Sequence, residues 1–113
     1  IEDNEDIAEI LLKRLKVSGY EAERIKDGIA AISRMMSKGD APDAIILDMM
    51  LPGRMGMDLL NSIKCTWDKT KIFVFSAHRE YENKIPKECI HGFFCKTDGV
   101  DLLLAEMKKA IGK

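Results

Sequence analysis

The sequence predicts an α/β domain in which helices cover both faces of a parallel sheet. Two continuous apolar runs, residues 44–47 and 72–75, have the length and composition of strands that are buried on both faces. Segments with a helical spacing of apolar residues lie before, between and after these runs. Strands that alternate with helices favour right-handed βαβ crossovers, which make neighbouring strands parallel. Because 113 residues suit one domain, we expect residues 1–113 to fold as a single unit.

The individual elements follow from local patterns along the chain. Weak alternation of apolar and polar residues over 20–25 predicts an edge strand, and the turn residues Asp27 and Gly28 follow it. The polar segment 80–90 is interrupted by Pro86, so any helix there should be short or begin late. The other predicted elements are strands at residue 1 and residues 93–95, and helices over residues 7–15, 29–36, 59–67 and 100–111.

Composition excludes several classes of protein. Hydrophobic residues make up 46% of the chain and charged residues 33%, which is typical of a globular domain. The net charge is −1 with scattered Lys and Arg, so we expect no direct binding of nucleic acid. No apolar run approaches the roughly 18 residues of a membrane span. The three cysteines lack a disulfide-framework spacing and favour a cytoplasmic location. The chain opens at Ile1 without an initiator Met, and we expect further residues upstream in the natural protein.

Polar side chains stand where each predicted strand ends. Glu2 and Asp3 follow the first strand, and Asp48, Ser76 and Lys96 follow or end the later ones. In open parallel sheets, ligands bind at the carboxyl ends of the strands. Three carboxylates held close together repel each other unless a cation such as Mg²⁺ neutralises them. A lysine and a hydroxyl can contact phosphoryl oxygens, so the set resembles a site for phosphoryl transfer with Asp48 as nucleophile.

Four motifs in this order resemble the receiver domain of two-component response regulators, the CheY-like family. They are the Glu2-Asp3 pair, IILDMMLPGRMG around Asp48, FVFSA through Ser76, and FFCK ending in Lys96. The resemblance spans nearly the whole chain. It implies a flavodoxin-like three-layer α/β/α sandwich with a five-stranded parallel sheet of order 2-1-3-4-5. The first strand of that sheet is truncated here to Ile1.

The resemblance also implies an activity. A sensor histidine kinase or a phosphotransfer protein would phosphorylate Asp48 with the help of Mg²⁺, or of Mn²⁺ in its place. The domain would later lose the phosphoryl group by hydrolysis, so it would catalyse only its own phosphorylation and dephosphorylation. Phosphorylation would switch a partner-binding surface. The signal would pass on through an attached effector domain or a homodimer, without a direct contact to nucleic acid or membrane.

The metal ligands can be carried over residue by residue. Asp3 and Asp48 would bind the metal directly. Glu2 would act through a water molecule, and the backbone carbonyl of Met50 would supply another ligand. The resemblance thus implies an oxygen-only set of ligands, which suits Mg²⁺.

The resemblance further assigns the residues around the phosphoryl group. Lys96 would contact it and Ser76 would respond to it. Phe93, three residues before the lysine, would be the switch aromatic, and it lacks the phenolic hydroxyl of the commoner Tyr. Met50 and His78, two residues beyond the acceptor and the serine, would flank the path of attacking water. We expect Met50 to slow hydrolysis because it gives water no hydrogen-bonding partner.

One departure concerns the loop after the lysine. The family usually has a proline with a cis bond there, and this chain has Thr97. A cis bond before a residue other than proline costs about 3 kcal/mol, so we expect a trans bond or a strained loop.

Other readings of the same residues remain open. A phosphatase with a phosphoaspartate intermediate usually needs a second acid two residues after the nucleophile, where this chain has Met50. An FMN carrier needs a Ser/Thr-rich phosphate loop where the acidic pair stands. A receiver that binds partners without being phosphorylated is the closest rival. Cys89, His91 and Cys95 resemble a loose metal trio, but no fourth ligand for zinc is apparent.

Overall fold

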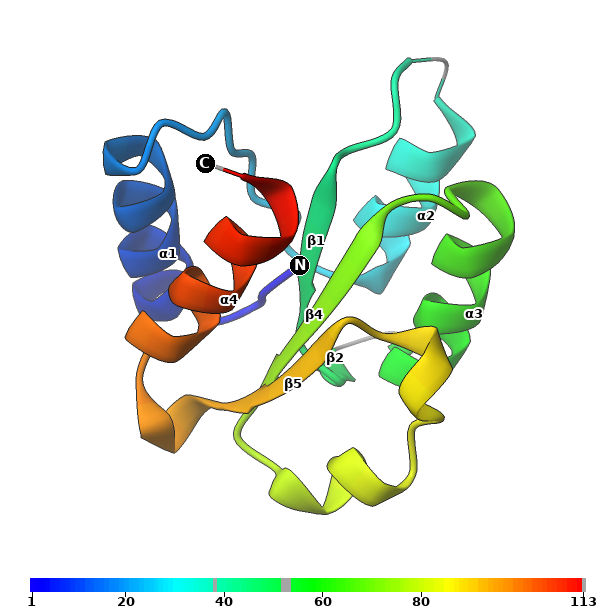
Figure 1. The fold of residues 1–113 in the computed structure, drawn as a ribbon. Coiled ribbons are helices and arrows are strands. Elements are labelled where there is room, and N and C mark those ends of the chain that lie inside the picture. Colours follow the sequence, from blue (N-terminus) through cyan, green and yellow to red (C-terminus); the bar gives the residue numbers. More distant parts are fainter. Residues whose placement is uncertain (38, 52–53, 113) are drawn as a thin grey trace.

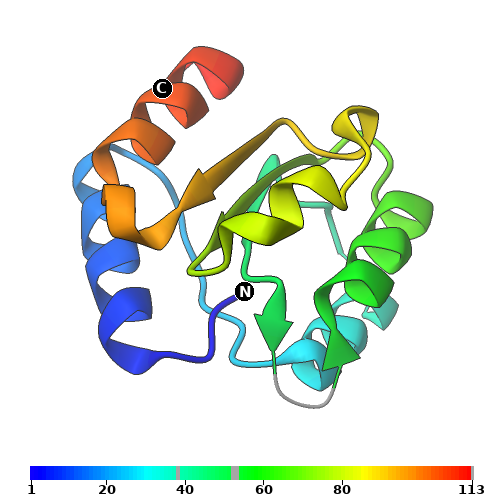
Figure 2. The same ribbon diagram turned by 90° about the horizontal axis from the view of Figure 1, so that it is seen from below.

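The centre of the computed structural model is a parallel sheet with helices on both faces. The structure describes residues 1–37, 39–51 and 54–112, without the side chains of residues 50, 51, 54 and 55. Within these residues the sheet has three strands in the order β1-β4-β5, with α1 and α4 on one face and α2 and α3 on the other (Figure 1, Figure 2). This confirms the predicted three-layer α/β/α arrangement. The bounds are β1 (Ala44–Leu47), β4 (Lys71–Ser76), β5 (Gly92–Cys95), α1 (Glu5–Val17), α2 (Gly28–Met36), α3 (Gly56–Thr66) and α4 (Asp101–Ile111).

The middle strand, β4, separates two apolar clusters. Its side chains alternate between the faces of the sheet, as the period of two in a strand requires. Ile72 and Val74 pack with residues of β1, α2 and α3, whereas Phe73 and Phe75 pack with residues of α1 and α4. The continuous apolar sequence of the strand is therefore explained by burial on both faces. The main partners of the two clusters are Ile45, Leu47, Leu59, Leu60 and Ile63 on one face and Leu11, Leu103 and Met107 on the other.

Helix α1 begins immediately after the acidic pair. The Asn4 side chain accepts a hydrogen bond from the backbone N–H of Ile7 at 3.0 Å, which caps the helix and fixes where it starts. Arg14 of α1 and Asp101 of α4 form an ion pair at 2.5 Å. The cap makes residues 2–4 a short link between Ile1, which bonds to β1, and helix α1, while the ion pair joins α1 to α4.

The predicted edge strand at residues 20–25 is not a strand in the structure. The segment has no regular secondary structure and makes one backbone hydrogen bond to the start of the chain, from the N–H of Glu2 to the carbonyl of Ile25 at 3.0 Å. Its expected neighbour is only one or two residues long, so a regular ladder cannot form. On its other side Ile1 bonds to β1: the N–H of Asp48 donates to the Ile1 carbonyl at 3.1 Å, and the Ile1 amine donates to the Ile46 carbonyl.

The segment between β4 and β5 contains only short helices. Two 3₁₀ helices, η1 (Arg79–Asn83) and η2 (Lys87–Cys89), stand on either side of Pro86. The expectation that any helix here is short is therefore confirmed. The ring of Pro86 and its missing N–H prevent one continuous helix.

Two further features were not expected or were left open by the sequence. Strands β2 (Met50–Leu51) and β3 (Arg54–Met55) form a small antiparallel ladder after Asp48. The peptide bond between Lys96 and Thr97 is trans, because no cis bond occurs among the described residues, and the chain continues as η3 (Lys96–Asp98). Among those residues, no helix is both long and apolar enough to cross a bilayer.

Gly56 allows the chain after Asp48 to pack closely against the start of α3. A Cβ atom at this position would lie 2.5 Å from the Met49 Cα atom and 2.6 Å from the Met49 carbonyl oxygen. Because both contacts are to backbone, we expect Gly56→Ala to lower the free energy of unfolding by about 3 kcal/mol. Urea denaturation followed by circular dichroism measures this.

Gly19→Ala is the matched control. Gly19 has φ +93°, and nothing lies within 4 Å of the place that a Cβ atom would occupy there, so only backbone strain of about 1 kcal/mol is expected. Equal losses in the two variants would contradict the proposed close contact at Gly56.

Candidate functional site

Three carboxylates meet at the carboxyl end of the sheet. Asp48 follows β1, and Glu2 and Asp3 follow Ile1, which is hydrogen-bonded alongside β1. One carboxylate oxygen from each of the three residues lies within 4.8 Å of the other two. Glu2 is 5% exposed and Asp48 4% exposed, while Asp3 is more open to solvent. The strand ends thus bring these acids together.

Lys96 supplies the counter-charge inside this cluster. Its Nζ atom lies 2.8 Å from Glu2 Oε1 and 2.9 Å from Asp48 Oδ2. The register of β4 and β5 pairs Ser76 with Cys95. Lys96, the next residue, therefore follows β5 at the edge of the sheet where β4 also ends. These three carboxylates and the ammonium together carry a charge of −2, which one divalent cation would neutralise. The residues therefore fit a hard divalent ion by both charge and oxygen ligands.

The electrostatics of the site are dominated by burial and by the lysine. Burial raises the pKa of Glu2 and the nearby Asp48 charge adds to this, while hydrogen bonds from Lys96 and from the Asn4 N–H oppose the shift. Burial alone would lower the pKa of Lys96, but its hydrogen bonds to Glu2 and Asp48 raise it above the usual value. The lysine is consequently held as a charged ammonium at neutral pH.

The other predicted residues lie around this cluster. Ser76 ends β4, is completely buried, and its Oγ accepts a hydrogen bond from the His78 N–H at 3.1 Å. The His78 imidazole is exposed, with Nδ1 3.3 Å from Glu80 Oε1. Phe93 of β5 is half-buried and packs against the core cluster on the α2 and α3 face. The side chain of Met50 lies outside the described part of the chain.

Arg24 is a site residue that sequence reasoning missed. Its Nε donates to the Glu2 carbonyl at 3.1 Å, and its Nη2 donates to the Asp3 carbonyl at 3.0 Å. Arg24 shares an alternating row with Tyr20 and Ala22, so a charged residue in an otherwise apolar row was the available signal. A charge in such a position needs partners, and here they are backbone carbonyls.

An α/β sandwich with acids and a lysine at the strand ends defines a class of domains that bind charged ligands at that edge. Comparison with protein families makes this specific. The family model of the response regulator receiver domain matches residues 1–108. The chain belongs to the response regulator receiver domain family.

Individual relatives agree with this assignment. The response regulator MprA of Mycobacterium avium is 29% identical over 85 residues, which cover 75% of this chain and 36% of MprA. The response regulator TrrA of Thermotoga maritima, solved in complex with Mg²⁺-BeF, is 26% identical with a TM-score of 0.84, covering 96% of this chain and 93% of that one. In a complex of the histidine kinase ThkA with TrrA, the matching chain is 25% identical with a TM-score of 0.83, covering 97% of this chain and 93% of that one. The chain therefore spans well under two thirds of the length of MprA.

Removal of the lysine leaves two buried carboxylates without their counter-charge. We expect Lys96→Met to lower the free energy of unfolding by about 3 kcal/mol in EDTA, because an uncompensated buried charge is costly. Lys109→Met is the control: its ion pair with Glu106 is exposed, with Nζ and Oε1 3.4 Å apart, and we expect a loss below about 0.5 kcal/mol. Urea denaturation measures both, and similar losses would contradict a structural role for the Lys96 pairs.

Proposed function

We propose that this receiver domain accepts a phosphoryl group on Asp48 from a sensor histidine kinase or a phosphotransfer protein. The observation that supports this most is the position of Asp48, nearly buried at the end of β1, 2.9 Å from Lys96 and within the acidic cluster. The solved complex of a histidine kinase with the similar response regulator TrrA supports the class of donor.

The proposed transfer uses few protein groups. An Asp48 carboxylate oxygen forms a bond to phosphorus while the bond from phosphorus to the donor's histidine nitrogen breaks. Lys96, which already donates to Asp48 Oδ2, is positioned to stay with the oxygens of the transferred group. The domain would thus catalyse its own phosphorylation and, with water as the attacking group, its own dephosphorylation.

We propose Mg²⁺, or Mn²⁺ in its place, as the ion that neutralises charge between the carboxylates and the phosphoryl oxygens. Asp3 and Asp48 would be direct ligands and the Met50 carbonyl a third. Both Glu2 oxygens are engaged, Oε1 by Lys96 at 2.8 Å and Oε2 by the Asn4 N–H at 3.1 Å, which supports a contact through water. The Mg²⁺-BeF complex of TrrA supports an ion of this kind.

We propose that Ser76 and Phe93 transmit the phosphorylated state. The Ser76 hydroxyl is bonded to the His78 N–H, so a hydroxyl that turned towards a phosphoryl group would release the loop that begins at His78. Phe93 packs against the same core cluster as Tyr81 and Ile85, which follow His78 in the chain, and would report the change by its burial. The output would act through an attached effector domain or a homodimer, without direct contact to nucleic acid or membrane.

We further propose that residues 1–113 are one domain with the strand order 2-1-3-4-5. Support comes from Ile1, which hydrogen-bonds to β1 on one side while Glu2 bonds to Ile25 on the other. Slow amide exchange at Glu2 and Asp48 would support this order, and fast exchange at both would contradict it.

The three cysteines are free thiols, which supports a cytoplasmic location.

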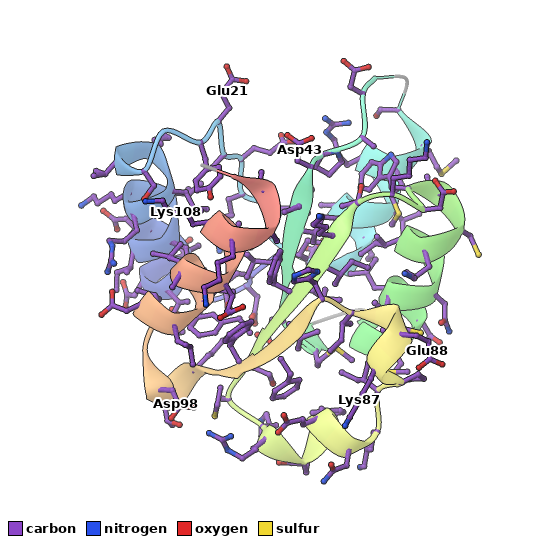
Figure 3. The ribbon with its side chains drawn as sticks, viewed as in Figure 1. Glu21, Asp43, Lys87, Glu88, Asp98 and Lys108 are labelled. Carbon is purple, nitrogen blue, oxygen red and sulfur yellow. The ribbon has the colours of Figure 1, made fainter. Side chains whose placement is uncertain are left out.

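Acetyl phosphate tests the acceptor directly. With Mg²⁺ we expect the mass of the chain to increase by one phosphoryl group located on Asp48, and Asp48→Asn should abolish the increase. Asp43→Asn is the control, because Asp43 directly precedes β1, the strand that Asp48 follows. In Figure 3 it lies at the opposite end of the molecule from Asp98, which is in the loop after β5. A wild-type chain without an adduct would favour the receiver that binds partners without phosphorylation.

Met50 should determine how long the phosphorylated form lasts, and His78 would flank the water path from the other side. We expect Met50→Asn to accelerate the decay of phospho-Asp48 several-fold, because an amide can orient an attacking water. Met36→Asn is a matched control, since Met36 is 81% exposed on α2. Decay is followed by mass spectrometry after removal of acetyl phosphate. If the two variants decay like the wild type, Met50 does not shield the acyl phosphate.

A further inference from the structure

We propose that Arg24 is a positioning residue that holds Asp3 in place for the divalent cation. This inference rests on the metal-dependent function proposed above and extends it to a residue outside the strand-end motifs. Arg24 lies on the segment between α1 and α2, whereas Glu2 and Asp3, whose carbonyls it binds, lie at the start of the chain.

The contact is a two-point clamp on successive carbonyls. Arg24 Nε binds the Glu2 carbonyl at 3.1 Å, and Nη2 binds the Asp3 carbonyl at 3.0 Å. The Glu2 N–H donates to the neighbouring Ile25 carbonyl at 3.0 Å. Residues 24–25 therefore fix the backbone of residues 2–3 through three hydrogen bonds. The rigid, planar guanidinium suits such a clamp better than a single ammonium would.

Asp3 depends on this clamp more than the other two acids do. The carboxylates of Glu2 and Asp48 are both held by Lys96. Within the described part of the chain, the Asp3 side chain has no hydrogen bond or ion pair. The direction of its carboxylate is consequently set by its backbone, and the backbone is set by Arg24. Groups that orient metal ligands in this way typically change metal affinity 10- to 100-fold when removed.

A positioning role and a purely electrostatic role of Arg24 predict opposite changes in metal affinity when the side chain is removed. A guanidinium near the cluster repels a second cation, so on electrostatic grounds alone a neutral side chain would tighten metal binding. A positioning role predicts weaker binding instead. It also predicts that lysine does not replace arginine, because one ammonium keeps the charge but cannot hold two carbonyls in the same geometry.

Mn²⁺ binding distinguishes these possibilities without relying on phosphorylation. We expect Arg24→Met and Arg24→Lys each to weaken Mn²⁺ binding about 10-fold or more, measured by electron paramagnetic resonance of the free ion. Lys26→Met is the matched control: it removes an exposed positive charge two residues away on the same segment and should leave the affinity close to wild type. Unchanged or tighter binding in Arg24→Met, or wild-type binding in Arg24→Lys, would overturn the proposal.

A measurement on the wild-type chain covers the case in which both variants fail to fold. The Arg24 Nε–H should give a slowly exchanging NMR signal, and Mn²⁺ should broaden it strongly. An Nε–H that exchanges freely with water, or is unaffected by Mn²⁺, would overturn the proposal.

The acceptor function is assayed separately from the clamp. At saturating Mg²⁺, folded Arg24 variants should reach the wild-type extent of Asp48 phosphorylation, while half-saturation requires more metal. A wild-type chain that binds Mn²⁺ through the Arg24-dependent site but gives no phospho-Asp48 would refute the proposed acceptor function alone. Normal phosphorylation with the same metal requirement in all variants would refute the role of Arg24 alone.

Discussion

The ammonium of Lys96 is the interaction on which the rest of this site depends. It lies between Glu2 and Asp48, at 2.8 Å and 2.9 Å, and so joins the end of β5 to two other segments of the chain. Carboxylates exposed by only 5% and 4% are expensive to keep ionised unless a positive charge stands beside them. The strand order makes this possible, because parallel strands bring their carboxyl ends to one edge of the sheet.

The same arrangement gives the site its capacity for a ligand. One ammonium among three carboxylates leaves the cluster short of positive charge, and Asp3, the most exposed of the three, has no side-chain partner within the described residues. The buried carboxylates of Glu2 and Asp48 thus have Lys96 as a positive partner, while the more exposed carboxylate of Asp3 has none among the described residues. A cation that bound there would complete the charge balance. A phosphoryl group on Asp48 would instead compete with Glu2 for Lys96, so the acidic turn before α1 would sense the change.

Features set by local sequence were predictable, and those set by distant partners were not. The apolar runs around Ile45 and Phe73 indicated buried strands, and the polar residues that follow them indicated the site. The segment at residues 20–25 has the alternation of a strand but lacks a neighbour long enough to pair with it. The clamp by Arg24 was only half visible for a related reason. Its charge in an otherwise apolar row indicated that it needs partners, but those partners are the carbonyls of residues more than twenty positions away, and backbone carbonyls leave no signature in a sequence.

The region that would carry the signal outward is held differently from the site itself. Of residues 79–90, only Ile85 is buried, and the two 3₁₀ helices expose most of their side chains, including Lys87 and Glu88 (Figure 3). An ion pair at 2.7 Å between Arg79 and Asp98 links this segment to the turn after Lys96, but both side chains are exposed, and such pairs stabilise weakly. Short 3₁₀ helices have poorer hydrogen-bond geometry than α-helices, so their own backbone hydrogen bonds stabilise this segment only weakly. The segment next to Ser76 is instead held to the core by the buried Ile85 and by the partly buried Tyr81, Cys89 and Ile90. Its position therefore depends on side-chain packing more than on regular hydrogen bonding, whereas the site itself is fixed by the sheet.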